Sequence, residues 1–254
     1  MLVISSGQTD LGRVRKNNED SLAIADDLHL YVVADGMGGH LAGEVASSAA
    51  VKIIADFIKI TQGQADIAWP YPPDDQLSRN CNRLKTALRS ANREIFQSAQ
   101  QRPECRGMGT TAVALLFSAD KVCIAHAGDS RAYRITDISA AQLNKDHTLY
   151  AEQFGDLPSV PENFFTQSLK NILTRSLGLN EDVEIDTTEF TWKDGDIYLL
   201  CSDGLSNYVS TDEMQVVVKQ FGDQLQDAGR ALINLANTRG GSDNITVVII
   251  QACH

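Results

Sequence analysis

Four aspartates, each at the end of an apolar run and next to a glycine or asparagine, are the residues most able to do chemistry. They are Asp35, Asp129, Asp203 and Asp243. An apolar run that stops at such a pair is typical of a buried strand ending in a turn. If those strand ends meet, the carboxylates repel one another and cannot all stay ionised alone. A hard divalent cation prefers oxygen ligands and relieves that repulsion, so the sequence predicts a site for more than one metal ion.

The bulk composition limits the classes of function. The chain has 254 residues, 43% of them hydrophobic, which suffices for one sizeable core or at most two small domains. Its 22 Lys and Arg against 33 Asp and Glu give a net charge of -11, which argues against nucleic acid or an anionic membrane as the main partner. The first residues are too short and uncharged for a signal peptide, and no apolar run reaches the ~20 residues of a spanning helix. We expect a soluble, cytoplasmic monomer.

The five cysteines show no Cys-x-x-Cys spacing. This pattern favours buried or incidental free thiols over a zinc site or a disulfide framework.

The elements that must position the aspartates follow from periodicity. Strands are expected at residues 2–9, 21–25, 28–34, 110–117, 122–126, 132–135, 183–190, 196–201 and 245–252. Helices are expected at residues 43–60, 77–101, 168–177, 211–219 and 225–238. Strands and helices are grouped and do not alternate, which favours antiparallel sheets with helices outside. The expected fold class is α+β, an αββα sandwich with two antiparallel sheets face to face, flanked by helices.

Seven short motifs then occur in one order over nearly the whole chain. They are RKNNED at 15–20, DGMGGH at 35–40, GMGTT at 107–111, GDSR at 128–131, DHT at 146–148, SDG at 202–204 and DNIT at 243–246. With these motifs the chain resembles the metal-dependent serine/threonine protein phosphatases of the type 2C class (the PPM family), in their compact bacterial form. The resemblance implies one catalytic domain over residues 1–254, with a flap subdomain at about 146–178.

The resemblance also implies a ligand set for Mn²⁺ or Mg²⁺. Asp35 would bridge two core ions, Asp203 and Asp243 would hold the first ion, and the backbone carbonyl of Gly36 would hold the second. Glycine at that position lets the backbone approach an ion closely. For any single aspartate, an ordinary Asp-Gly turn is the competing interpretation.

Three further acidic residues complete the implied set. Glu19 and Asp20 would act at the second ion through waters, and Asp129, together with Asp203, would hold a third and looser ion. Asn244 is expected to orient Asp243 or its loop.

Two basic residues are candidates for the chemistry itself. Arg15 is the expected phosphate anchor, because a guanidinium can bind two phosphate oxygens and keeps its charge. The alternative is that it belongs to a solvated basic stretch. His40 is the expected general acid for the leaving serine or threonine oxygen, since histidine titrates near neutral pH. His126 and His147 are expected to be structural or hydrogen-bonding residues.

The function implied is metal-dependent hydrolysis of phosphoserine and phosphothreonine on proteins. A metal-activated water would attack directly, and signatures of a hydroxyl or thiol nucleophile are absent from the sequence. The expected partners are phosphorylated proteins, a bacterial Ser/Thr kinase that the enzyme opposes, and the substrates of that kinase. One alternative is a non-catalytic module of the same fold that binds a kinase or phosphopeptide. Another is a phosphatase for small molecules with the same chemistry.

Overall fold

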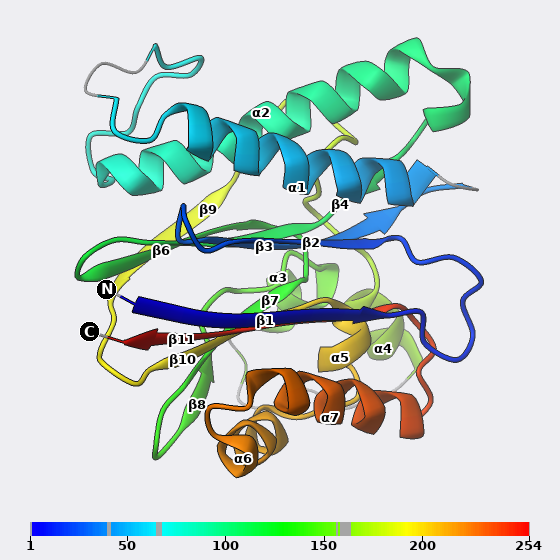
Figure 1. Cartoon of the computed structure of the whole chain (residues 1–254). Helices are drawn as coiled ribbons and strands as arrows, with labels where there is room; N and C mark the ends of the chain where they lie inside the picture. The colour runs from blue at the N-terminus through cyan, green and yellow to red at the C-terminus, as the bar shows by residue number, and fades with distance from the viewer. Residues whose placement is uncertain (1, 40–41, 65–67, 156, 158–163, 254) are drawn as a thin grey trace.

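The computed structural model describes residues 2–39, 42–64, 68–155, 157 and 164–253, and in these ranges two antiparallel β-sheets lie face to face (Figure 1). Helices cover the outer face of each sheet, so the layers run helix, sheet, sheet, helix. The predicted α+β class and αββα sandwich are therefore confirmed.

One sheet joins the two ends of the described chain. Its order is β1 (Leu2–Asp10), β11 (Ile245–Cys253), β10 (Ile197–Cys201), β7 (Arg131–Ile135) and β8 (Ala140–Gln142). The other sheet has the order β2 (Asp20–Ala25), β3 (Leu30–Met37), β5 (Ala112–Phe117), β6 (Lys121–Ala127) and β9 (Asp186–Thr191), and β4 (Gly109–Thr110) pairs with β3. Every pairing between these strands is antiparallel.

Long helices form the two outer layers. α1 (Ala42–Ile60) and α2 (Arg79–Gln101) lie on the β2–β9 sheet, and α6 (Thr211–Phe221) and α7 (Leu225–Thr238) lie on the β1–β8 sheet. The shorter helices are η1 (Pro103–Cys105), α3 (Leu149–Phe154), α4 (Phe164–Lys170) and α5 (Asp203–Ser206). Among these described helices, none is both long and apolar enough to cross a membrane.

The core has three apolar layers, because the side chains of each strand point alternately to the two faces of its sheet. In β11, Val247 and Ile249 point to the layer under α6 and α7, whereas Val248 and Ile250 point to the layer between the sheets. Since neighbouring side chains of a strand point to opposite faces, a strand buried on both faces needs a continuous apolar run. The third layer lies between the β2–β9 sheet and helices α1 and α2.

One predicted helix is wrong. The sequence pattern predicted a helix over residues 168–177, but α4 ends at Lys170. Beyond it the chain makes isolated bridges, Leu173 with Thr148 and Leu177 with Thr110. The Thr110–Leu177 bridge has hydrogen bonds of 3.0 and 2.8 Å in both directions. These tertiary backbone bonds outweigh the weak helical preference of the segment.

The expectation that all cysteines are free thiols is also wrong. Cys81 of α2 and Cys123 of β6 form a disulfide, with their Cα atoms 5.5 Å apart. Cys105, Cys201 and Cys253 are free. The bonded pair is 42 residues apart in sequence, so only the packing of α2 on β6 brings the two sulfurs together.

Candidate metal centre

The predicted aspartates come from strand ends that meet at one edge of the sandwich. Asp20 and Asp35 are direct neighbours across the β2–β3 pairing. Asp203 begins α5 two residues after the end of β10, and Asp243 lies two residues before the start of β11. Because β10 and β11 are antiparallel neighbours, the end of one strand lies beside the start of the other. The two sheets thus bring carboxylates toward a common rim.

A cavity of about 660 Å³ at this rim brings most of the predicted site residues together. Its lining includes Arg15, Glu19, Asp35, Gly36, Asp129, Asp203 and Asp243. Asp20 is not in the lining; it is buried behind it, 7% exposed. His40 lies outside the described residues.

Gly36 fits its position through close backbone packing. A β-carbon there would lie 2.1 Å from the carbonyl oxygen of Gly43 and 2.6 Å from that of Glu19. The Gly36 N–H also donates to the Glu19 carbonyl over 3.0 Å. Any larger residue would push the rim of the cavity apart.

The carboxylates of the rim are crowded and poorly hydrated. Burial, followed by the negative charges of Asp20 and Asp203, raises the pKa of Asp35 well above its usual value. Burial and the charge of Asp203 raise the pKa of Asp129 to about 7. Burial and the charge of Asp243 raise the pKa of Asp203. Without a cation, this cluster favours bound protons.

Asp20 links the two sheets beneath the cluster. Its Oδ2 accepts hydrogen bonds from the hydroxyls of Ser202 and Thr246, each at 2.7 Å. Burial raises the pKa of Asp20 to about 7, although these two hydrogen bonds oppose the rise. The Ser202 and Thr246 contacts were not predicted from the sequence. The available signal was one polar residue directly after the apolar run of β10 and another inside the apolar run of β11.

The donor set fits a hard divalent cation. Oδ1 of Asp20 and Oδ1 of Asp203 are buried and have no hydrogen-bond partner among the described residues. Buried carboxylate oxygens without partners are costly. Asp203 lines the cavity, so a cation bound there would take its Oδ1 as a ligand. Asp35, Asp203 and Asp243 line this cavity together with Glu19 and Asp129.

Arg15 is available at the mouth of the cavity. Its Nη2 donates to Oδ2 of Asp243 over 2.6 Å, yet its side chain is 49% exposed. This hydrogen bond raises the pKa of Arg15, so the guanidinium stays charged. An exposed ion pair of this kind is weak and can exchange partners. Arg15 is therefore positioned to bind an anion that enters the cavity.

Asn244 holds the loop that bears Arg15 and Glu19. Its backbone N–H donates to Oδ1 of Asp243 over 2.8 Å, and its side-chain oxygen accepts the Glu19 N–H over 2.8 Å. Its amide nitrogen donates to the carbonyls of Leu11 and Asn17, both at 3.0 Å. Asn244 was expected to orient Asp243 or its loop; its backbone N–H contacts Asp243, whereas its side chain holds the segment of residues 11–19.

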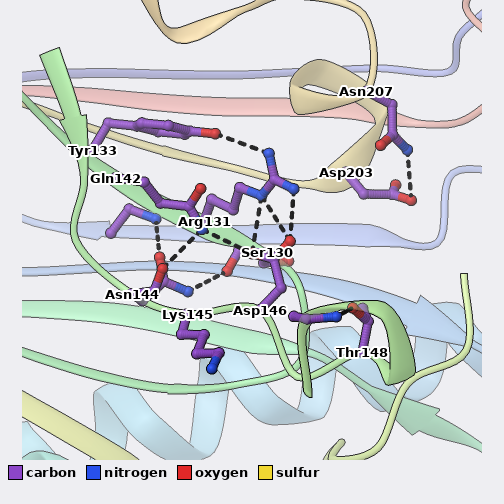
Figure 2. Close-up of polar contacts among 12 residues, drawn as sticks. Ser130, Arg131, Tyr133, Gln142, Asn144, Lys145, Asp146, Thr148, Asp203 and Asn207 are labelled. Carbon is purple, nitrogen blue, oxygen red and sulfur yellow. Dashed lines mark hydrogen bonds and ion pairs between the residues drawn. The ribbon is translucent and has the colours of Figure 1, made fainter. Parts of the chain in front are cut away.

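A second polar cavity of about 540 Å³ shares Asp129 and Asp203 with the first. There Arg131 holds Asp146 through three contacts of 2.6–3.1 Å, and Asn207 donates to Oδ2 of Asp203 over 3.1 Å (Figure 2). The Arg131–Asp146 pair anchors the chain directly after Asp129. Neither Asn207 nor this ion pair was predicted as part of the site.

Comparison with known proteins agrees with this geometry. The sequence profile named Protein phosphatase 2C matches residues 12–241. The chain belongs to the protein phosphatase 2C family. The predicted family is thus confirmed.

Relatives of this family match over nearly the whole chain. The serine/threonine phosphatase stp of Listeria monocytogenes is 36% identical over 251 residues, covering 96% of this chain and 94% of the relative. The protein phosphatase PhpP of Streptococcus pneumoniae is 33% identical and covers 96% of this chain and 95% of its own.

Solved structures of the family share the fold. The serine/threonine phosphatase PstP/Ppp of Mycobacterium tuberculosis superposes with a TM-score of 0.85 at 33% identity, covering 100% of both chains. The catalytic domain of PstP, solved in complex with two manganese ions, gives a TM-score of 0.81 at 33% identity, covering 99% of both chains.

A histidine cluster in this phosphatase fold also has the composition of a metal site. Potential ligand atoms of His126, His147 and Asp186 lie within 4.8 Å of one another, the one such group of three found among the described residues. However, the Gly128 N–H donates to Nδ1 of His147 over 3.2 Å, so the Nε2 of His147 carries the proton and faces Asp186 at 3.2 Å. Arg175 donates to the other oxygen of Asp186 over 2.7 Å.

The contacts of this cluster satisfy its members without a metal ion. The Nε2 atom of His126 lies 2.9 Å from the carbonyl oxygen of Lys145. The His126 ring stacks on the ring of His147. Burial lowers the pKa of both imidazoles, which keeps them neutral. The expectation that His126 and His147 are structural or hydrogen-bonding residues fits these contacts.

Proposed function

We propose that this chain hydrolyses phosphoserine and phosphothreonine esters on proteins with the help of Mn²⁺ or Mg²⁺. The observation that supports this most strongly is the rim itself: crowded carboxylates, among them Asp203 with an unpartnered buried oxygen, share one cavity with an exposed arginine. Relatives named serine/threonine phosphatases, 33–36% identical over 96% of the chain, support the same activity.

The proposed ligands come from both sheets. Asp35, with the Gly36 carbonyl, and Asp203 and Asp243 would hold two core ions, as the two manganese ions of the PstP structure suggest. Asp129 would hold a third ion together with Asp203. Glu19 and Asp20 would act on the second ion through water, and Asn244 fixes the Glu19 backbone for that role. When bound, such ions would lower the pKa of a water molecule and thereby supply a nucleophile at neutral pH.

The remaining proposed roles fall on two basic residues. Arg15 would release Asp243 and bind phosphate oxygens of the substrate, because a phosphate offers its guanidinium two acceptors. We keep His40 as the proposed general acid that protonates the leaving oxygen; its position is outside the described residues. Arg15→Ala is expected to raise KM for a phosphorylated substrate more than it lowers kcat.

The test is hydrolysis of para-nitrophenyl phosphate and of a phosphothreonine peptide by EDTA-treated protein, with Mn²⁺, Mg²⁺ or Ca²⁺ added back. Activity on both substrates with Mn²⁺ or Mg²⁺ is expected. Asp203→Asn should abolish it, whereas Asp223→Asn, an exposed acidic residue outside the rim cavity, should not. Activity on the small ester alone would indicate a small-molecule phosphatase. A folded protein that is inactive with every metal would refute the proposal.

The finer biological context is part of the same proposal. The curated relatives cited above are bacterial phosphatases. We propose that this enzyme acts as a monomer in the cytoplasm and opposes a bacterial Ser/Thr kinase. Light scattering on the purified chain tests the monomer, and incubation with the phosphorylated kinase and its substrates tests the opposition. Unchanged phosphorylation of all of them by active enzyme would contradict it.

A further inference from the structure

The rim cavity has an apolar part that catalysis does not explain. Four aliphatic side chains share its lining with the carboxylates, and we call them the apolar lining group: Met37, Ile172, Leu173 and Leu179. Ile172 is 45% exposed and Leu179 is 43% exposed. Single exposed aliphatic residues are common on proteins. Here their placement is informative, because they share a cavity with the reaction site.

Backbone contacts hold this group in place. The Ile172 carbonyl accepts the Leu149 N–H over 2.9 Å, and the neighbouring Thr174 N–H donates to the carbonyl of His147 over 2.9 Å. Ile172 and Leu173 therefore stand on a segment fixed at both sides. A binding surface that is already ordered loses little entropy when a ligand covers it.

Leu179 is fixed in a comparable way. The preceding Gly178 N–H donates to Oδ1 of Asn92 on α2 over 2.7 Å, and Leu177 pairs with Thr110. A β-carbon at Gly109 would lie 3.0 Å from Cγ and Cδ2 of Leu179. The glycine thus leaves the space in which the leucine lies against β4.

The position of the group determines what can cover it. A permanent cover, such as a second subunit, would close the cavity that contains Asp35 and Arg15. The occupant must therefore enter and leave with the substrate. Burying large apolar side chains is the favourable interaction that such a surface offers.

We infer that the preferred substrates are phosphorylated protein segments with a large aliphatic side chain beside the phosphoserine or phosphothreonine. This inference rests on the proposed function. The phosphate would go to Arg15 and the carboxylate rim, and the neighbouring aliphatic side chain would cover Ile172 and Leu179. Ile172 and Leu179 are then specificity-determining residues.

The test compares two phosphothreonine peptides that differ only in the residues beside the phosphothreonine, leucine in one and serine in the other. The wild-type enzyme with Mn²⁺ should favour the leucine peptide in kcat/KM by roughly tenfold, the scale of discrimination that an apolar pocket gives. Ile172→Ser and Leu179→Ser should each bring the ratio toward one, and Ile172→Leu should keep it. Val216→Ser is the control, because Val216 is 64% exposed on α6 and does not line the cavity.

The outcomes separate this inference from the proposed function. Wild-type enzyme that hydrolyses para-nitrophenyl phosphate and both peptides with equal kcat/KM would overturn the aliphatic preference alone. A ratio that survives both serine variants would also overturn the assignment to Ile172 and Leu179. Wild-type protein without any phosphatase activity would overturn both. Thermal melting of each variant shows whether it is folded, and Ile172→Ser alone suffices if Leu179→Ser does not fold.

Discussion

At the scale of single residues, the rim combines groups that oppose folding when no cation is bound. Burial raises the pKa of Asp35, and the negative charges of the surrounding carboxylates raise it further. The pKa values of Asp203 and Asp129 are raised for the same reasons. Groups of this kind mark functional sites more often than structural ones. Replacing one of these carboxylates should therefore raise the stability of the metal-free protein and lower its activity.

Asp203→Asn is the sharpest such change. Its amide keeps the shape of the side chain and can retain the contact with Asn207, but it removes one negative charge. In EDTA we expect the variant to be more stable than wild type by about 1 kcal/mol, which corresponds to roughly 2–4 °C in Tm. With Mn²⁺ we expect activity to fall by about 100-fold or more and Mn²⁺ binding to weaken.

Calorimetry measures the stability in a melting scan in EDTA and the Mn²⁺ affinity in a titration. Asp223→Asn should change neither quantity. Near-native activity or unchanged Mn²⁺ affinity in Asp203→Asn would show that Asp203 is not a ligand.

At the scale of secondary structure, turns beside the rim depend on partners far away in sequence. Gly128, in the turn between β6 and β7, has φ of +108° and precedes Asp129. His147 fixes this glycine on both sides: its N–H donates to the Gly128 carbonyl over 3.0 Å, and its Nδ1 accepts the Gly128 N–H. The orientation of Asp129 thus depends on the neutral form of His147.

Two substitutions of His147 test this dependence. His147→Ala leaves the buried Gly128 N–H without its acceptor, which should cost about 1–3 kcal/mol of unfolding free energy. His147→Asn places an oxygen where Nδ1 was, so it should recover a large part of that loss. Urea unfolding measures the stability, and the Mn²⁺ concentration for half-maximal activity reports on Asp129. Equal loss in both variants would mean that the Gly128 contact is not what His147 contributes.

The same contrast between local and distant contacts explains what the sequence could predict. The long strands and helices were predictable because their apolar periodicity is local, as in β11 and α7. Asp35, Asp129 and Asp203 were predictable because each lies at or just after the end of such a run inside a family motif, whereas Asp243 precedes β11 and was predictable from its motif alone. The links from Asp20 to Ser202 and Thr246, and the Cys81–Cys123 disulfide, join segments far apart in the chain. The helix expected over 168–177 failed for that reason too, because Leu177 pairs with Thr110.

At the scale of the whole molecule, the rim joins the two sheets. Asp20 on β2 bonds to Ser202 and Thr246, next to β10 and within β11 of the other sheet. Protonation at the rim therefore affects the sandwich as a whole. The metal-free protein should consequently show a stability that depends on pH in a predictable direction.

The pKa values of Asp20 and Asp129 are raised from 3.8 to about 7 in the folded state. A raised folded-state pKa means that the folded protein binds more protons than the unfolded chain. The resulting stability is fully present below pH 3.8 and is lost as pH rises through about 7. In EDTA, the free energy of unfolding should still fall between pH 7 and pH 8, by about 0.4 kcal/mol for each group, because a carboxyl with a pKa near 7 has already lost half of its protons at pH 7.

Among the described residues, His126 and His147 oppose this fall, but only slightly above pH 7, where few histidines of the unfolded chain are still protonated. The pKa values of His126 and His147 are lowered, so both are neutral above pH 7 in the folded protein. Saturating Mn²⁺ should abolish the fall, because a bound cation keeps the carboxylates ionised. Urea unfolding at pH 7 and pH 8, with EDTA and with Mn²⁺, measures all four values. Metal-free stability that rises between pH 7 and pH 8 would show that the rim carboxylates are already ionised at neutral pH, and that their crowding is relieved without a cation.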